Sequence, residues 1–149
     1  MHPGRKTGLF DYMDGDATLE GFLALPAKPH ARDGRTPVVL VAHAWGGHDE
    51  FAREKAHMLA ELGYIGFAID VYGKGRRGGS PDESSQLMAP WIEDRAALRR
   101  RLLAAIEAAR HIEGGDPERL GVIGFCFGGL CAFDLARANA PGLRAAVGF

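Results

Sequence analysis

A cysteine stands at the centre of the hexapeptide GFCFGG, which runs from Gly124 to Gly129. The spacing Gly-x-Cys-x-Gly, between a segment typical of a strand and a segment typical of a helix, is the pattern of a nucleophile elbow. In such an elbow the residues two before and two after the nucleophile must lack a Cβ, so that strand and helix can approach closely. Gly124 and Gly128 meet this requirement, so the pattern predicts that Cys126 is a nucleophile on a strained turn.

The expected position of Cys126 also favours the reactive form of its thiol. At the N-terminus of the following helix, unpaired N–H groups and the helix dipole lower the pKa of a thiol from about 8.5. The alternative is structural, because free cysteine often behaves as a small buried hydrophobe. The agreement of spacing and flanks favours the nucleophile. Cys131 lies further along the helical segment, without this context, and we expect it in the core.

A second candidate segment is HAWGG, from His43 to Gly47, which follows the apolar run VVLVA. A glycine-containing turn at the end of a strand can present a backbone N–H toward an elbow. The amides of Ala44 and Phe127 would then form a two-donor oxyanion hole. His43 has two interpretations that the sequence leaves open. It could be a polar wall of the pocket beside Cys126, or a histidine bonded to nearby backbone that holds the loop.

A third segment, GKGRRG from Gly73 to Gly78, formally fits the dinucleotide-binding pattern G-x-G-x-x-G. That fingerprint should open a helix at once, whereas this run continues into GSPDE. We therefore interpret the segment as a flexible loop with solvated basic residues, and dinucleotide binding as the weaker hypothesis.

Apolar runs and helical periodicities alternate along the chain. The strands are expected at 9–13 and 18–25, joined at Asp14-Gly15, and at 38–42, 64–69, 119–125 and 143–149, with helices at 49–62, 98–109 and 128–138 and loops at 27–37 and 70–83. This alternation predicts an α/β fold with a doubly wound, mostly parallel sheet and helices on both faces. The candidate segments follow strands, at the carboxyl edge where sites of such folds lie.

Composition narrows the classes of protein. The 149 residues suggest a single domain over 1–149, and 46% hydrophobic with 25% charged residues suits a globular protein. A formal charge of −1 gives no reason to expect nucleic acid or an anionic membrane, and the run 99–101 of three arginines is interpreted as the solvated face of a helix. The chain shows no signal peptide and no membrane span of roughly 20 apolar residues, and its two cysteines fit neither a zinc pair nor a disulfide framework. We expect a cytoplasmic protein.

Taken together, VVLVAHAWGGHDEFAREKAHMLAELGYIGFAIDVYGKG and DPERLGVIGFCFGG resemble the dienelactone hydrolase family of α/β-hydrolases. The resemblance covers most of the chain, and its most specific part is a cysteine in the elbow. It implies hydrolysis of esters or lactones by a Cys-Asp-His triad, without metal or organic cofactor, and backbone donors at Ala44 and Phe127. Dienelactone hydrolases proper carry a glutamate where this chain has His43, and a substrate-binding arginine that has no counterpart between Gly79 and Asp94.

The order of the triad residues in this fold is nucleophile, acid and then histidine. The six histidines (His2, His30, His43, His48, His57 and His111) all precede Cys126, and the one Asp or Glu after it is Asp134, on the helix next to the elbow. We therefore expect about six of the eight strands of an α/β-hydrolase, in a chain that is incomplete at its C-terminus.

Two classes of function follow from these observations. The first is a carboxylic ester or lactone hydrolase with a cysteine nucleophile, inactive or impaired as this fragment. The alternative is a non-catalytic module that binds a small ligand or a partner. The expected partner is a small-molecule ester or lactone, without nucleic acid or membrane, and the last strand would leave an open sheet edge through which the chain could associate with itself.

Overall fold

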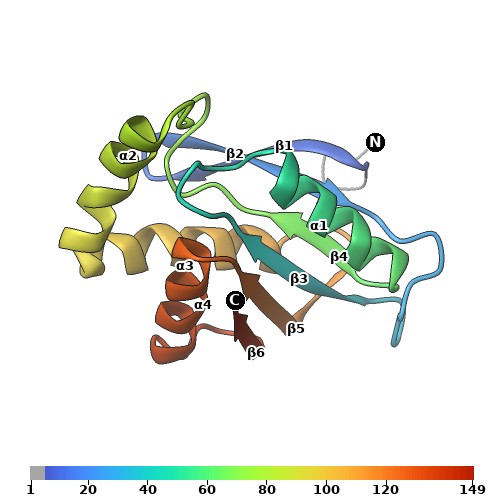
Figure 1. Cartoon of the computed structure of the whole chain (residues 1–149). Helices are drawn as coiled ribbons and strands as arrows, with labels where there is room; N and C mark the ends of the chain where they lie inside the picture. The colour runs from blue at the N-terminus through green and yellow to red at the C-terminus, as the bar shows by residue number, and fades with distance from the viewer. Residues whose placement is uncertain (1–5) are drawn as a thin grey trace.

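The computed structural model describes residues 6–149, so the predictions that involve residues 1–5, His2 among them, lie outside it. The described residues form one six-stranded sheet in the order β1-β2-β4-β3-β5-β6 (Figure 1). The strands are β1 (Gly8–Asp14), β2 (Ala17–Ala24), β3 (Thr36–Ala42), β4 (Ile65–Ala68), β5 (Gly115–Gly124) and β6 (Leu143–Gly148). Each overlaps a strand that the sequence predicts, although β3 begins two residues and β5 four residues earlier than expected.

The sheet is antiparallel at one side and parallel over the rest. β1 and β2 form the predicted hairpin, in which Asp14 pairs with Ala17, and β2 runs antiparallel to β4. β3 pairs in parallel with β4 and β5, and β5 pairs in parallel with β6. The carboxyl ends of these four parallel strands therefore meet at one edge of the sheet.

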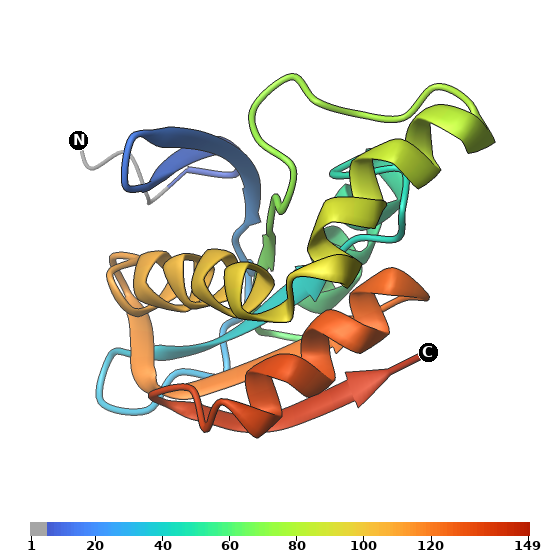
Figure 2. The same ribbon diagram turned by 90° about the vertical axis from the view of Figure 1, so that its left-hand side faces the viewer.

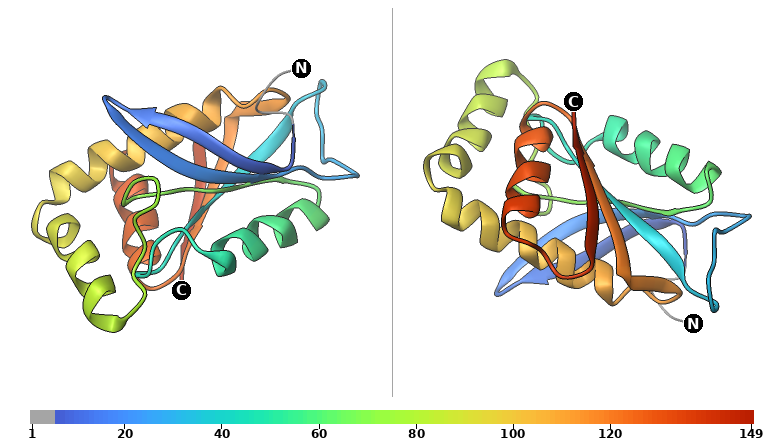
Figure 3. Two further views of the ribbon diagram at one scale, coloured as in Figure 1. Left: turned by 90° about the horizontal axis from the view of Figure 1, so that it is seen from above. Right: turned by 90° about the horizontal axis from the view of Figure 1, so that it is seen from below.

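Four helices accompany the sheet within residues 6–149, namely α1 (Glu50–Glu61), α2 (Pro81–Glu93), α3 (Arg95–Arg110) and α4 (Phe127–Arg137). α1 lies on one face, whereas α3 and α4 cover the other (Figure 3). α2 stands at the end of the sheet toward which the arrowheads of β3, β4 and β5 point (Figure 1). The predicted α/β fold with helices on both faces is confirmed. No helix in this part of the chain is long and apolar enough to span a membrane.

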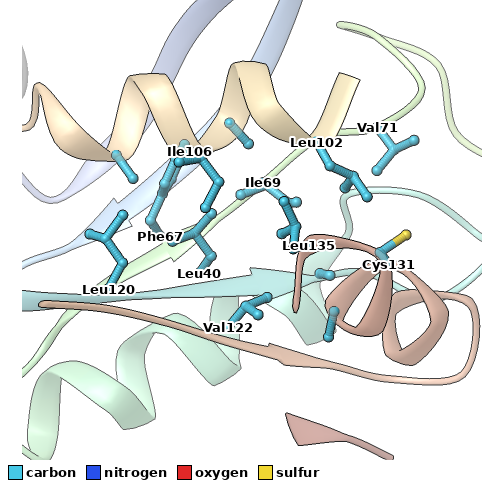
Figure 4. Close-up of a cluster of buried hydrophobic side chains, with 14 of the residues drawn as sticks. Leu40, Phe67, Ile69, Val71, Leu102, Ile106, Leu120, Val122, Cys131 and Leu135 are labelled. Carbon is cyan, nitrogen blue, oxygen red and sulfur yellow. The ribbon is translucent and has the colours of Figure 1, made fainter. Parts of the chain in front are cut away.

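The main core fills the space between the sheet and the pair α3 and α4 (Figure 4). Leu102 and Ile106 of α3 point toward Leu40 and Phe67 of the sheet, as their helical spacing predicts. Cys131 of α4 is fully buried in the same cluster, which confirms that it is a core residue. Burial raises the pKa of its thiol, so this cysteine stays protonated and unreactive.

α2 is a helix that the sequence analysis missed, because the run SPDE was taken as the end of a loop. Ser80 caps the helix by accepting a hydrogen bond from the Glu83 amide, while the Glu83 carboxylate accepts one from the Gly79 amide. Pro81 occupies the first turn, where proline is tolerated. The Ser-x-x-Glu spacing is close to a capping box and could have marked this start, but Pro90 interrupts the pattern of the helix interior.

On the opposite face, α1 begins after its predicted cap Asp49 and packs through three alanines directly on the sheet, namely Ala52, Ala56 and Ala60. The approach is so close that a Cβ built on Gly66 of β4 would overlap the carbonyl group of Ala56. Two backbones in contact cannot move apart without shifting a whole helix. The contact between α1 and β4 therefore requires glycine at position 66.

We predict that Gly66→Ala lowers the free energy of unfolding by about 1–3 kcal/mol, the usual range for overpacking a core. Gly121→Ala in β5 is the matched control, because a Cβ there meets its nearest atoms, Ala145 O and Val39, at an ordinary 3.8 Å. This control should change stability by less than about 1 kcal/mol. Denaturant unfolding of both variants measures the difference, and equal stabilities would contradict the role assigned to Gly66.

Candidate active site

The predicted elbow is present between β5 and α4. Cys126 lies two residues after the end of β5 and directly before Phe127, the first residue of α4, and its backbone has φ 57° and ψ −113°. A positive φ is rare for a residue with a Cβ and marks a backbone held in strain by its surroundings. Cys126 is exposed, in contrast to the buried Cys131. The chain therefore presents a strained, accessible thiol at the N-terminus of α4.

Two glycines permit this turn. A Cβ built on Gly124 would overlap the carbonyl group of Gly128, and a Cβ on Gly128 would overlap the carbonyl group of Ala42 and lie 2.7 Å from the His43 oxygen. The first contact brings the end of β5 close to the first turn of α4. The second places the start of α4 against the end of β3. The elbow and the segment HAWGG, predicted to lie close together, are thus in direct contact.

The strained conformation of Cys126 is held by hydrogen bonds on both sides. Its N–H donates to Phe149 O at 2.7 Å, and its C=O accepts a bond from Gly129 N at 2.9 Å. Phe149 N in turn donates to Gly124 O at 2.8 Å, and the Phe149 ring stacks on Phe125 with centroids 5.0 Å apart. The residue after β6 therefore helps to fix the geometry of the elbow.

The two predicted backbone donors lie on segments in contact. Phe127 is the first residue of α4, so its N–H has no partner within the helix, and Ala44 follows the end of β3. Neither amide donates a hydrogen bond to any group in the described part of the chain. The rings of His43 and Phe127 lie 6.2 Å apart between centroids. Both N–H groups are thus available at the carboxyl edge where Cys126 stands.

His43 is buried, with 1% of its surface exposed, and both ring nitrogens bond to backbone. Nδ1 lies 2.7 Å from Ala44 O, which can only accept, so Nδ1 carries the proton. Nε2 accepts a hydrogen bond from Val71 N at 3.0 Å. Burial lowers the pKa of the imidazole below its ordinary value. In this arrangement no ring nitrogen is left for Cys126, so the geometry matches the second interpretation, a histidine that holds the loop.

The sequence analysis missed the residues that bind the HAWGG segment to the turn after β4. Tyr72 donates its hydroxyl hydrogen to Trp45 O at 2.7 Å, and its ring stacks against Phe127. Asp70 is buried and accepts three backbone bonds, from Glu20, Tyr72 and Gly73. Both residues occur in the run DVYGKG, yet Trp45 and Glu20, the partners outside that run, lie 27 and 50 residues away. No local signal could have identified these two distant contacts.

Asp134 is occupied by arginines and does not serve the elbow. Its carboxylate accepts two bonds from Arg95, at 2.8 and 2.6 Å, and one from Arg137 at 2.7 Å. Although its burial opposes ionisation, these bonds lower the pKa of the Asp134 carboxyl. The group lines a hollow of about 330 Å³ between α3 and α4 whose lining does not include Cys126. This pairing with arginines agrees with the expectation from the sequence that Asp134, on the helix next to the elbow, is not the triad acid.

The other described histidines lie away from the elbow or are enclosed. His30 packs against Tyr64 before the amino end of β4, His57 packs on Phe22, and His111 follows α3. His48 is buried, its Nδ1 donates to Glu20 O, and no group among residues 6–149 bonds to its Nε2. Within those residues no three His, Cys, Asp or Glu side chains form a group that could hold a metal ion.

The segment GKGRRG is a loop, as predicted. Gly73 and Gly75 have positive φ, and α2 begins only at Pro81. Arg77 forms an ion pair with Glu20 at 3.0 Å. The loop does not open a helix at once, as a dinucleotide fingerprint does, because Gly79 and Ser80 separate it from α2.

The sequence model of the dienelactone hydrolase family matches residues 19–149. A Bradyrhizobium protein named "probable 2-oxo-3-(5-oxofuran-2-ylidene)propanoate lactonase" is 31% identical over 148 residues, which cover 97% of this chain and 57% of that protein. The chain spans about half the length of the curated relatives it matches.

Solved structures show the same architecture. A dienelactone hydrolase-like promiscuous phosphotriesterase from metagenomic libraries superposes with a TM-score of 0.86 at 32% identity, over 97% of this chain and 58% of that one. The dienelactone hydrolase of Anabaena variabilis shares the fold, with a TM-score of 0.66 at 20% identity over 96% of this chain and 62% of that one.

The enclosed His48 should make stability depend on pH. Burial lowers the pKa of His48 to about 4, whereas in the unfolded chain it is about 6.5. As the pH falls from about 6.5 toward 4, the unfolded state binds a proton that the folded state excludes, so the free energy of unfolding should fall by about 1.4 kcal/mol per pH unit. His48→Asn, which keeps a donor for Glu20 O, should flatten this dependence.

Denaturant unfolding at several pH values across this window provides the measurement. His111→Asn, which removes an exposed imidazole, is the control for the loss of one histidine. If His48→Asn and the original chain lose stability with the same slope, His48 does not exclude a proton.

Proposed function

Because the chain belongs to the dienelactone hydrolase family, we propose that it acts on carboxylic ester or lactone bonds with Cys126 as the nucleophile. The observation that carries this proposal is the backbone of Cys126, which has a positive φ on an exposed turn at the start of α4. Strain of this kind persists where the surroundings impose it, and it is concentrated at functional sites. A cysteine with a merely structural role would gain nothing from it.

The proposed reaction begins with attack of the Cys126 thiolate on the carbonyl carbon. The carbonyl oxygen becomes an oxyanion, which the free N–H groups of Ala44 and Phe127 stabilise by hydrogen bonds. Collapse of the tetrahedral intermediate breaks the C–O bond, releases the alcohol as an alkoxide that takes a proton, and leaves a thioester on Cys126. Attack of water on this thioester releases the acid and restores the thiol.

Proton transfer limits what residues 6–149 can do. Protonating the leaving group and activating water need a general base, a contribution of about 10²–10⁴-fold. His43 has both ring nitrogens bonded to backbone, and Asp134 is held by two arginines. An ester with a good leaving group needs no such proton for acylation. We therefore propose that this chain is acylated once by an activated ester and turns over slowly or not at all.

The relatives support this class of substrate. The Bradyrhizobium protein is named for a lactonase activity, and lactones and esters present the same carbonyl group to a thiolate. Both described cysteines are free thiols, which agrees with a reducing, cytoplasmic location. The alternative, a non-catalytic module that binds a small ligand or a partner, predicts no covalent intermediate, and this difference can be measured.

We predict that p-nitrophenyl acetate releases about one equivalent of p-nitrophenolate per chain in a single burst, because none of residues 6–149 is placed as a base for deacylation. Mass spectrometry should locate the acetyl group on Cys126. Cys126→Ala should abolish the burst, and Cys131→Ala, which changes the buried thiol, should retain it. Fusion to the C-terminal part of a homologous dienelactone hydrolase should convert the burst into repeated turnover.

The absence of an acetyl adduct on Cys126 would rule out the proposed nucleophile and favour the binding module. Steady turnover by the 149-residue chain alone would instead show that a base operates within it. Iodoacetamide labelling of the same samples reports whether the thiol is accessible, so that an occluded thiol is distinguished from an unreactive one.

We also propose that the outer edge of β6 can mediate self-association. In the described residues β6 pairs with β5 and with no other strand, and Val147 and Phe149 are 46% and 69% exposed. An unpaired apolar edge favours pairing between chains. Light scattering should show association that rises with concentration and weakens in Val147→Lys, because a charge on an edge strand opposes pairing. A monomer at all concentrations would contradict this proposal.

A further inference from the structure

Arg101 of α3 is not on a solvated helix face, contrary to the prediction for the run 99–101. Arg99 and Arg100 are exposed as expected, but the Arg101 side chain is only 13% exposed and points into the protein. Its Nε donates to Asp14 Oδ2 at 2.7 Å, and its guanidinium lies 4.7 Å from the ring centroid of Trp91. Three elements, β1, α2 and α3, therefore converge on one guanidinium.

The remaining contact of Arg101 leads toward the candidate site. Its Nη1 donates to the carbonyl oxygen of Val71, in the turn after β4. The N–H of Val71 donates to His43 Nε2 at 3.0 Å, and His43 Nδ1–H donates to Ala44 O at 2.7 Å. Three consecutive bonds thus connect α3 to the residue whose N–H is one of the proposed oxyanion donors.

The turn after β4 has two consecutive peptide groups with every polar atom paired. In the first, Tyr12 donates to the carbonyl of Asp70, and His43 accepts from the N–H of Val71. In the second, Arg101 donates to the carbonyl of Val71, and the Asp70 carboxylate accepts from the N–H of Tyr72. The orientation of these peptides is therefore set by four side chains, those of Tyr12, His43, Asp70 and Arg101.

We propose that Arg101 is a positioning residue for the Ala44 N–H, acting through Val71 and the neutral ring of His43. This inference rests on the proposed function, because it assigns a purpose to the donor at Ala44. Without the guanidinium, the carbonyl of Val71 loses its partner, and the peptide group between Val71 and Tyr72 is free to tilt. That tilt turns the backbone at Val71, whose N–H in the adjoining peptide group donates to His43. His43 then no longer holds the Ala44 carbonyl, and the adjacent N–H moves from its position.

This role affects one kind of reaction at Cys126 and not another. Acylation by an ester passes through an oxyanion that needs the Ala44 donor, and a displacement of about 1 Å in such a group can cost about a hundredfold in rate. Alkylation by iodoacetamide displaces iodide from a saturated carbon and forms no oxyanion. The ratio of the two rates therefore reports the donor, while each rate alone also reports the thiol.

The experiment uses the 149-residue chain and the variant Arg101→Met, which keeps much of the apolar length of the side chain. We expect acylation of Cys126 by p-nitrophenyl acetate to slow about ten- to hundredfold, with alkylation by iodoacetamide changed by less than about twofold. The Ala44 amide resonance should shift in the nitrogen-proton correlation spectrum. Arg100→Met, which removes the exposed neighbour, is the matched control and should leave both rates unchanged.

A second pair of variants tests the link at His43. His43→Gln keeps one donor and one acceptor, and His43→Leu keeps neither, so we expect acylation to be retained better by glutamine than by leucine. If Arg101→Met acylates at the original rate, or loses alkylation and acylation equally, the positioning role is wrong. If the original chain forms no acyl group on Cys126, the proposed function itself fails, which is a different result from the same assay.

Discussion

The contact between the start of α4 and the end of β3 is the constraint on which the site depends. Gly128 lies against the carbonyl of Ala42, and Gly124 lies against the carbonyl of Gly128. The backbones approach so closely at these two positions that only glycine fits there. Because the helix begins on top of the strand end, Phe127, the first residue of α4, lies beside the segment after β3. The positive φ of Cys126, a strain of about 1–3 kcal/mol, is the cost of this close approach.

Hydrogen bonds and ring contacts around the elbow hold the turn in this strained conformation. Phe149 bonds to the backbone on both sides of the elbow, and its ring covers Phe125. Behind the elbow, the turn after β4 and the segment after β3 share hydrogen bonds through His43 and Tyr72. A buried polar group that loses its partner costs about 1–3 kcal/mol, so these two turns keep one arrangement relative to each other.

The same residue types serve opposite purposes according to where the fold places them. Cys126 is exposed on a strained turn, whereas Cys131, five residues later, is sealed in the core and stays protonated. The three adjacent arginines divide in the same way, because one turn of a helix carries its residues to different sides. Arg101 reaches inward to Asp14 and Val71, while its neighbours lie in solvent.

The amino-acid sequence by itself determined the features that depend on near neighbours. The elbow follows from the two glycines around Cys126, the strands from continuous apolar runs, and α1 from its cap at Asp49 and its helical spacing. Two cap signals were overlooked, at Ser80 and at Asp94, so the sequence analysis missed α2 and began α3 three residues late. Each of these features is encoded within a few residues, because turns, caps and periodicity are local properties of the backbone.

The tertiary structure decided which side chains support the site. His43 bonds to a residue 28 positions later, Tyr12 to one 58 positions later, and Arg101 to Asp14 across 87 positions. Such partners are chosen by strand order and helix packing, which the spacing of residues does not contain. The sequence therefore left the role of His43 open between two interpretations. It also could not show that Arg101 turns inward, because burial and hydrogen bonding at these positions arise only when distant segments meet.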